Sequence, residues 1–335
     1  MDARRPVAVI TDSTACLPEA IATELEIEVV PVTITIDGKQ HADRDDLGQR
    51  LDQLLVGRAR ATTSAPAPGV YLAAMRRSLQ QGRSVLCITV AQRFSAMRQS
   101  AEDAAVLLRR EVPGVEIEIL DSQNSAMAQG FVAIAAARRA LQGGNLEQCR
   151  EAAARAIASS HLVFAIDDLS YLARSGRVPH LVAWAAGLLQ VKPIVHSHSG
   201  GEHLLDRVRT MKRALERLPS AAAGIIASAG GELHFAVQHG DMPEQAADLA
   251  ESIQARFRPA SLTITPFTPA ILVHTGPRLV GVAFYRDATA VGPVHPPGVP
   301  ARFANPPGGK GRASRSGGEV EGRAWGSLPS RRGMR

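Results

Sequence analysis

Aromatic residues are scarce in this chain, and two familiar nucleotide-binding motifs are absent. Phe, Trp and Tyr together make up 4% of the 335 residues. Modules that bind nucleic acid by base stacking need exposed aromatic rings, so the composition argues against that class. The Gly-rich dinucleotide fingerprint is missing after the first predicted strand, and no P-loop occurs anywhere in the chain.

Cysteine is also rare, and the sequence shows no metal-binding pattern. Cys16, Cys87 and Cys149 are far apart, with no CxxC pair and no His/Cys cluster. Cysteines with this spacing usually behave as small buried hydrophobic residues of a protein in a reducing compartment. No apolar run approaches the ~18 residues of a membrane span. Because the first residues enter a predicted strand almost at once, we expect no signal peptide and a cytoplasmic protein with no integral membrane segment.

The net charge of +6 comes from the end of the chain. Residues 288–335 hold eight Lys and Arg against two Glu, which leaves 30 charges of each sign in the remaining 287 residues. Those residues have no basic excess, so nucleic-acid binding is not suggested for them. The last 48 residues include ten Gly and seven Pro without periodicity, and we expect a disordered tail over 288–335.

Strands and helices alternate along the rest of the chain. Hydrophobic residues amount to 45%, mostly Ala, Val, Leu and Ile, which is typical of an α/β protein. The order predicts one α/β domain over residues 1–160 and a second, hairpin-containing α/β domain over residues 161–287. Strands are predicted at 7–10, 28–36, 85–90, 115–120, 162–166, 192–195, 204–208, 233–238, 262–265, 271–273 and 279–285, and helices at 18–25, 47–55, 68–82, 95–110, 125–141, 146–159, 181–189, 210–218 and 243–257.

Two places combine hydroxyl groups with a predicted helix start. Ser95 follows the strand at 85–90 and opens a run with helical spacing, so we expect it to act as the N-cap. Residues 61–68 form a predicted loop with three consecutive hydroxyl side chains before Pro66 and Pro68. Helix starts beyond the carboxyl ends of strands are places where anions and other ligands bind.

Eight segments in order resemble the DegV family of bacterial fatty-acid-binding proteins. The resemblance extends over about residues 6–285, in spacing as well as in content. The segments are VITDSTACLP, TTSAPAP, FSAMRQSA, ILDSQNSAMAQG, DDLSYLARSGRV, QVKPIV, DRVRTMKRAL and VHTGP.

The resemblance implies a DegV-like two-domain architecture, with an N-terminal Rossmann-like three-layer α/β/α domain and a second α/β domain with a mixed sheet. It also implies one long-chain fatty acid enclosed between the domains, with no other cofactor and no metal. Some members present this acid to a fatty acid kinase, whose acyl phosphate product is used in phospholipid synthesis. The resemblance thus implies a lipid-binding protein or subunit that is not itself an enzyme.

Site residues follow from the same motifs. The threonine of the family's Thr-Ser-x-Pro loop falls on Thr63, with Ser64 beside it, and the serine of its Ser-Gly-Thr turn falls on Ser95. The histidine of His-Thr-Gly-Pro falls on His274. These four residues are the expected carboxylate ligands, and Arg177 in the basic glycine turn is the expected kinase-docking residue.

The chain departs from the family pattern at three positions. Ser95-Ala96-Met97 lacks one glycine and one hydroxyl of the family's Ser-Gly-Thr turn. Ser175-Gly176-Arg177 has serine in place of the first glycine of Gly-Gly-Arg. Gly276-Pro277-Arg278 has arginine in place of the last glycine of Gly-Pro-Gly.

Simpler roles for these residues stay open. Ser95 can be a plain helix cap, Thr63 and Ser64 can be turn residues, and His274 can be a hydrogen-bonded histidine at a strand end. Arg177 can be a solvated turn residue. An alternative function is a serine-dependent acyl hydrolase or a phosphoryl-transfer enzyme in which Ser95 pairs with His274, although no Gly-x-Ser-x-Gly elbow is present. A third is an interaction protein that no longer binds lipid.

Overall fold

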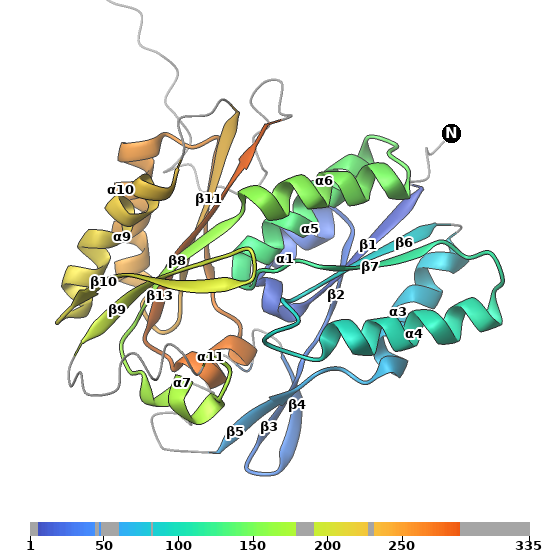
Figure 1. The fold of residues 1–335 in the computed structure, drawn as a ribbon, viewed down its shortest axis with the longest axis horizontal. Coiled ribbons are helices and arrows are strands. Elements are labelled where there is room, and N and C mark those ends of the chain that lie inside the picture. The colour runs from blue at the N-terminus through green and yellow to red at the C-terminus, as the bar shows by residue number, and fades with distance from the viewer. Residues whose placement is uncertain are drawn as a thin grey trace, which may run out of the picture. The chain divides into compact units, whose positions relative to one another are not determined.

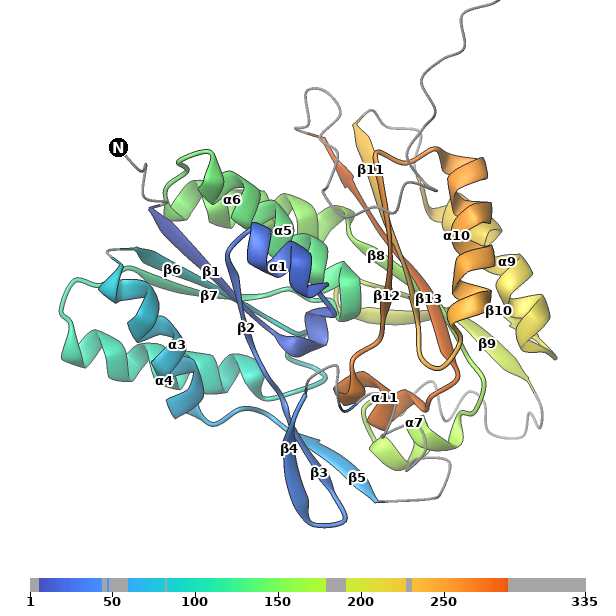
Figure 2. The same ribbon diagram turned by 180° about the vertical axis from the view of Figure 1, so that it is seen from behind.

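The protein is an α/β structure with three β-sheets in its described part (Figures 1 and 2). A computed structural model describes residues 6–43, 47, 60–81, 83–178, 191–226 and 231–288. Apart from residue 47, the helix expected at 47–55 lies outside these residues, and so does the helix expected at 181–189. Of the predicted tail, residues 289–335 lie outside them as well.

The first sheet is parallel and is covered on both faces by helices. Side chains of β1 and β6 alternate, so that Val9 and Leu86 belong to one apolar cluster and Ile10 and Cys87 to another. One pair of helices, α3 and α4, packs on one face, and α5 and α6 pack on the other (Figure 1). The strand order is β2-β1-β6-β7. The elements are β1 (Val7–Asp12), β2 (Ile27–Val30), β6 (Ser84–Thr89), β7 (Ile117–Asp121), α3 (Pro68–Gln80), α4 (Met97–Glu111), α5 (Ala126–Leu141) and α6 (Leu146–Ser159). A 3-10 turn, Ser13–Ala15, and a short helix α1 (Glu19–Glu24) connect β1 to β2.

The second sheet is mixed and has the order β10-β9-β8-β13-β11-β12. Only β11 and β12 run parallel; the other neighbours are antiparallel. Helices α9 and α10 pack on one face, and α5 and α6 contact β13 from the other side. The elements are β8 (His161–Ile166), β9 (Lys192–His198), β10 (Gly201–Val208), β11 (Glu232–His239), β12 (Ser261–Pro266), β13 (Leu279–Asp287), α9 (Met211–Ile225) and α10 (Pro243–Phe257).

A small antiparallel sheet, β4-β3-β5, was not predicted as a sheet. Its strands are β3 (Thr33–Ile36), β4 (Lys39–Ala42) and β5 (Ala61–Ser64). The single strand predicted at 28–36 is therefore wrong: the chain leaves the parallel sheet after β2, passes Pro31 and enters this sheet. The predicted loop at 61–68 is also wrong in its first half, which is β5. The turn predicted at Asp37-Gly38 is confirmed by positive φ angles of 46° and 83°.

Two short helices flank the place where the sheets meet. They are α7 (Ser170–Ser175) and α11 (Pro269–Thr275). The strand predicted at 271–273 lies inside α11, so that prediction is wrong. An apolar run of three residues does not distinguish a strand from a buried helical turn. Pro269 at the first helical position and Gly276 at the end are the signals that define this helix.

The predicted α/β fold class is confirmed by these sheets. The described residues fall in one compact unit, because the layer formed by α5 and α6 packs against both large sheets. The domain boundary at residue 160 stays a prediction; it coincides with the Ser160 joint between α6 and β8. Within the described part of the chain, no helix is both long and apolar enough to cross a bilayer.

Candidate functional site

A narrow cavity of about 130 Å³ lies where the three sheets converge. Most of its lining is apolar, including Val90, Phe94, Leu162, Phe164 and Phe267. One water-sized group needs ~10–15 Å³ of such space, so the cavity takes on the order of ten of them. A small number of polar side chains also face it, which is the usual composition of a ligand pocket.

Thr63 and His274 meet in this cavity although 211 residues separate them. In β5 the side chains alternate, so Thr63 faces inward beside buried Ile34 while its neighbours point out. His274 is in the last turn of α11. The Thr63 Oγ1 and His274 Nε2 atoms are 2.7 Å apart, and both residues line the cavity. The two most distant predicted ligands are therefore brought into direct contact.

The His274 ring is neutral at physiological pH. Burial, with a smaller contribution from the positive charge of Arg177, lowers its pKa to about 4. A neutral imidazole has one N–H donor and one acceptor nitrogen. The ring can therefore exchange a hydrogen bond with Thr63 at Nε2 without placing a charge in the apolar cavity.

Arg177 supplies a permanent positive charge at this end of the cavity. Helix α7 ends at Ser175, and its C-cap is Gly176, whose φ of 64° is in the left-handed region. Arg177 follows immediately; it is exposed to solvent and lines the cavity. An exposed guanidinium close to a neutral histidine and a threonine hydroxyl is suited to an anionic group at the mouth of an apolar pocket.

Ser95 lines the same cavity, but it is not the N-cap of α4. The helix begins at Met97, and Ala96 occupies the cap position, where its carbonyl accepts from the Ser100 N–H. The prediction of a capping Ser95 is therefore wrong. Among the described residues its hydroxyl has no hydrogen-bond partner. Since capping does not use this hydroxyl, it is available to a ligand.

Ser64 is the predicted ligand that the structure does not bring to the cavity. It follows Thr63 on β5, so its side chain is on the opposite face, where it is exposed. The motif placed the two hydroxyls side by side in sequence, but strand alternation separates them. The predicted pairing of Ser95 with His274 is likewise not seen, because the hydroxyl bonded to His274 Nε2 is that of Thr63.

The departures from the motif have separate consequences. Met97 is buried and lines the cavity, so a thioether stands where the motif has a hydroxyl. The Arg278 Nε atom is 2.8 Å from Asp167 Oδ2, and Lys192 Nζ is 2.8 Å from Asp167 Oδ1. Arg278 is thus held by a carboxylate on the surface and is not part of the cavity lining in the described chain.

Sequence reasoning missed two buried carboxylates that support the site. Asp12, at the end of β1, accepts hydrogen bonds from the N–H of Val90 and the amide of Gln129, and burial raises its pKa. Asp43 accepts from Ser13 Oγ at 2.6 Å and from the Ala270 N–H of α11 at 3.0 Å. The signal that could have found Asp12 is the polar Thr-Asp-Ser-Thr sequence that begins in the last two residues of β1; nothing local marks Asp43.

Comparison with known proteins identifies the family and the fold. A family model described as "Uncharacterised protein, DegV family" matches residues 6–287. The chain belongs to the DegV family. A DegV domain-containing protein of Streptomyces coelicolor is 34% identical over 280 residues, which is 83% of this chain and 98% of the relative.

Two solved DegV structures share the fold. A DegV family protein of Thermus thermophilus, described by its fatty acid binding, is 26% identical with a TM-score of 0.77. The match covers 84% of this chain and 99% of that one. DegV of Bacillus subtilis, described as a fatty acid binding protein, is 25% identical with a TM-score of 0.73, over 84% and 99% of the two chains. The family resemblance expected from the sequence is confirmed.

Proposed function

We propose that this DegV protein binds one long-chain fatty acid in the cavity between its large sheets and performs no chemistry on it alone. The observation that carries the proposal is the Thr63–His274 contact in a cavity whose lining is largely apolar. The solved relatives described as fatty-acid-binding proteins support the same conclusion.

The alkyl chain would supply most of the affinity. Each buried methylene contributes about 0.8 kcal/mol, so a long chain contributes on the order of 10 kcal/mol before the costs of ordering. Cavity space for on the order of ten water-sized groups holds the larger part of such a chain. The apolar walls formed by Phe94, Leu162 and Phe164 suit this part of the ligand.

The carboxylate would occupy the polar end. A charge cannot be buried without donors, because the free-energy cost of desolvating it is too high. Thr63, Ser95 and His274 offer neutral donors, and the Arg177 guanidinium balances the charge from the solvent side. Ser64 remains outside this group, because it is exposed on the other face of β5.

We further propose that the bound acid is presented to a fatty acid kinase, which forms the acyl phosphate for phospholipid synthesis. A kinase must reach the carboxylate, so the docking surface must adjoin the polar end of the cavity. Arg177 meets that requirement, since it is exposed and lines the cavity. Its guanidinium is also suited to the additional charge of a phosphate group.

Exchanging Thr63 for valine tests the carboxylate site. A hydrogen bond to a charged group contributes ~1.5–3 kcal/mol, so Thr63→Val should weaken binding of oleate or palmitate by about tenfold or more. The measurement is displacement of a fluorescent fatty acid from delipidated protein. Ser64→Ala is the matched control, because it removes the adjacent hydroxyl from the exposed face and should change affinity less than about twofold.

Two results would contradict the proposal. One is a wild-type protein that carries no acid after native purification, as judged by lipid mass spectrometry, and takes up none of the added acids. The other is equal affinity for Thr63→Val and Ser64→Ala, which would place the carboxylate elsewhere.

A further inference from the structure

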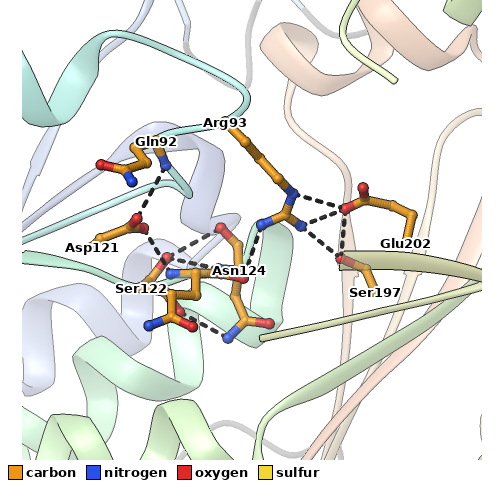
Figure 3. A network of polar contacts seen from close by, with 8 residues as sticks. Gln92, Arg93, Asp121, Ser122, Asn124, Ser197 and Glu202 are labelled. Atoms are coloured by element: carbon orange, nitrogen blue, oxygen red, sulfur yellow. Dashed lines mark hydrogen bonds and ion pairs between the residues drawn. The ribbon is translucent and has the colours of Figure 1, made fainter. Parts of the chain in front are cut away.

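The wall of the cavity includes an ion pair between Arg93 and a buried carboxylate, Glu202. Ser197 on β9 and Glu202 on β10 both line the cavity, and the Glu202 side chain is only 3% exposed. Arg93, in the loop between β6 and α4, reaches across to both of them (Figure 3). A carboxylate and a hydroxyl group thus face a slot whose lining is mostly hydrocarbon.

Strand register sets the separation between two cavity-lining residues, Leu279, which follows α11, and Ser197, which contacts the ion pair. Leu279, five residues after His274, is paired with Ile166, whereas Ser197 is paired with Leu162 four residues back along β8. Four residues of strand span ~13 Å, and the steps from β13 through β8 to β9 add ~10 Å sideways, which gives a diagonal of ~17 Å. An extended chain of single bonds advances ~1.2 Å per bond, so this distance corresponds to about fourteen carbons.

The polar groups of this ion pair and its neighbours are bonded to one another. Arg93 Nε donates to Glu202 Oε1 at 3.2 Å, and Arg93 Nη2 donates to the same oxygen and to Ser197 Oγ. Ser197 Oγ lies 3.3 Å from Glu202 Oε1, and Arg93 Nη1 donates to the carbonyl of Gln123 at 3.3 Å (Figure 3). The guanidinium also lies 4.1 Å from the ring centre of Phe94, which lines the cavity.

The terminal methyl group of a bound acid makes no favourable polar interaction with these ionic groups. To pass, the chain would have to separate Arg93 from Glu202 and leave a buried carboxylate without its cation, which is strongly unfavourable. Alkyl contacts with the walls do not compensate, because the extra methylenes would lie against ionic groups.

We propose that Arg93, Glu202 and Ser197 form the closed end of the acyl slot and limit the bound acid to about fourteen carbons in extended form. This inference rests on the proposed function, since it specifies which acids the site holds. It assigns a specificity role to three residues that lie outside the carboxylate site.

The test is a ladder of saturated acids from ten to twenty carbons. Wild-type affinity should rise about fourfold per methylene up to a break near fourteen carbons, and then level off or fall. Exchanging both charges together (Arg93→Ala with Glu202→Ala) avoids an unpaired buried charge and should move the break to longer acids by at least two carbons. The readout is displacement of a fluorescent fatty acid, which gives the position of the break and not only the overall affinity.

Two further variants make the result interpretable. Arg76→Ala with Glu111→Ala removes an exposed pair between α3 and α4, with a shortest distance of 2.5 Å, and should leave the break unchanged. Glu202→Gln keeps the side-chain shape and weakens the interaction with Arg93, so acids longer than the break should lose less affinity than they do in wild type. This variant tests the inference even if the double variant does not fold.

The inference is overturned if decanoate and dodecanoate bind normally while the break stays in place in both Glu202 variants. A wild-type protein that binds no acid of any length would instead overturn the proposed function itself.

Discussion

Asp43 shows how one buried carboxylate connects distant parts of the chain. It directly follows β4, and its two oxygens accept from Ser13 Oγ and from the Ala270 N–H. The latter bond holds the first turn of α11, the helix that carries His274. Burial raises the pKa of Asp43 from 3.8 to about 6, while its hydrogen bonds act in the opposite direction.

This pKa predicts a defined pH dependence of stability. Because the folded pKa exceeds the unfolded pKa, the stabilising contribution is complete below pH ~4 and is lost as the pH rises through about 6. The loss amounts to about 3 kcal/mol. An Asn at this position does not titrate, so Asp43→Asn is the reference. The free energy of unfolding of wild type relative to this variant should fall by about 3 kcal/mol between pH 4 and 7. Urea denaturation at several pH values measures it; a difference that does not vary with pH would contradict the assignment.

At the scale of elements, α11 depends on its surroundings. With seven residues it is too short to be stable alone. Asp43 binds its start, and its end is defined by Gly276, where φ is 82° and ψ is 166°. This backbone region is essentially restricted to glycine. A Cβ at this position would also lie 2.7 Å from the ring of Tyr171 in α7, so the two helices pack through the glycine.

Gly276→Ala should therefore destabilise the protein by about 1–3 kcal/mol, from backbone strain and from displacement of Tyr171. Gly69→Ala, in the first turn of α3, is the control. Apart from its chain neighbours and the backbone of its own helix, no heavy atom lies within 4 Å of a Cβ built at Gly69. The substitution should therefore be neutral or slightly stabilising. The measurement is the urea midpoint at constant m-value. Equal midpoints for the two variants would show that α11 does not need the glycine.

At the scale of the molecule, the two large sheets share one core. Helices α5 and α6 cover the parallel sheet and also contact β13 of the mixed sheet. A single apolar cluster accordingly contains Val9 and Leu86 from one sheet and Leu162 and Ala283 from the other. The cavity lies at this shared region, so its shape depends on both sheets being folded.

The shared core predicts a single cooperative unfolding transition over residues 6–288, despite the two sheets. Amides of β6 and of β13 should lose protection from hydrogen exchange at the same urea concentration, and far-UV circular dichroism should report that same midpoint. Separate midpoints for the two strands would mean that the sheets unfold as independent domains.

The sequence by itself determined the α/β class and most of the helices and strands, and it pointed to Thr63 and His274 as candidate ligands. Periodicity and turn chemistry are local, and they were sufficient for β6, α5 and the Asp37-Gly38 turn. The family motifs selected Thr63 and His274 without showing why they belong together. Only the tertiary structure decided that Ser64 faces away, that Ser95 is free of capping, and that Arg93 meets Glu202 across 109 residues. Those outcomes depend on which face of a strand a residue occupies and on which strands become neighbours, and both are set by packing between segments far apart in the chain.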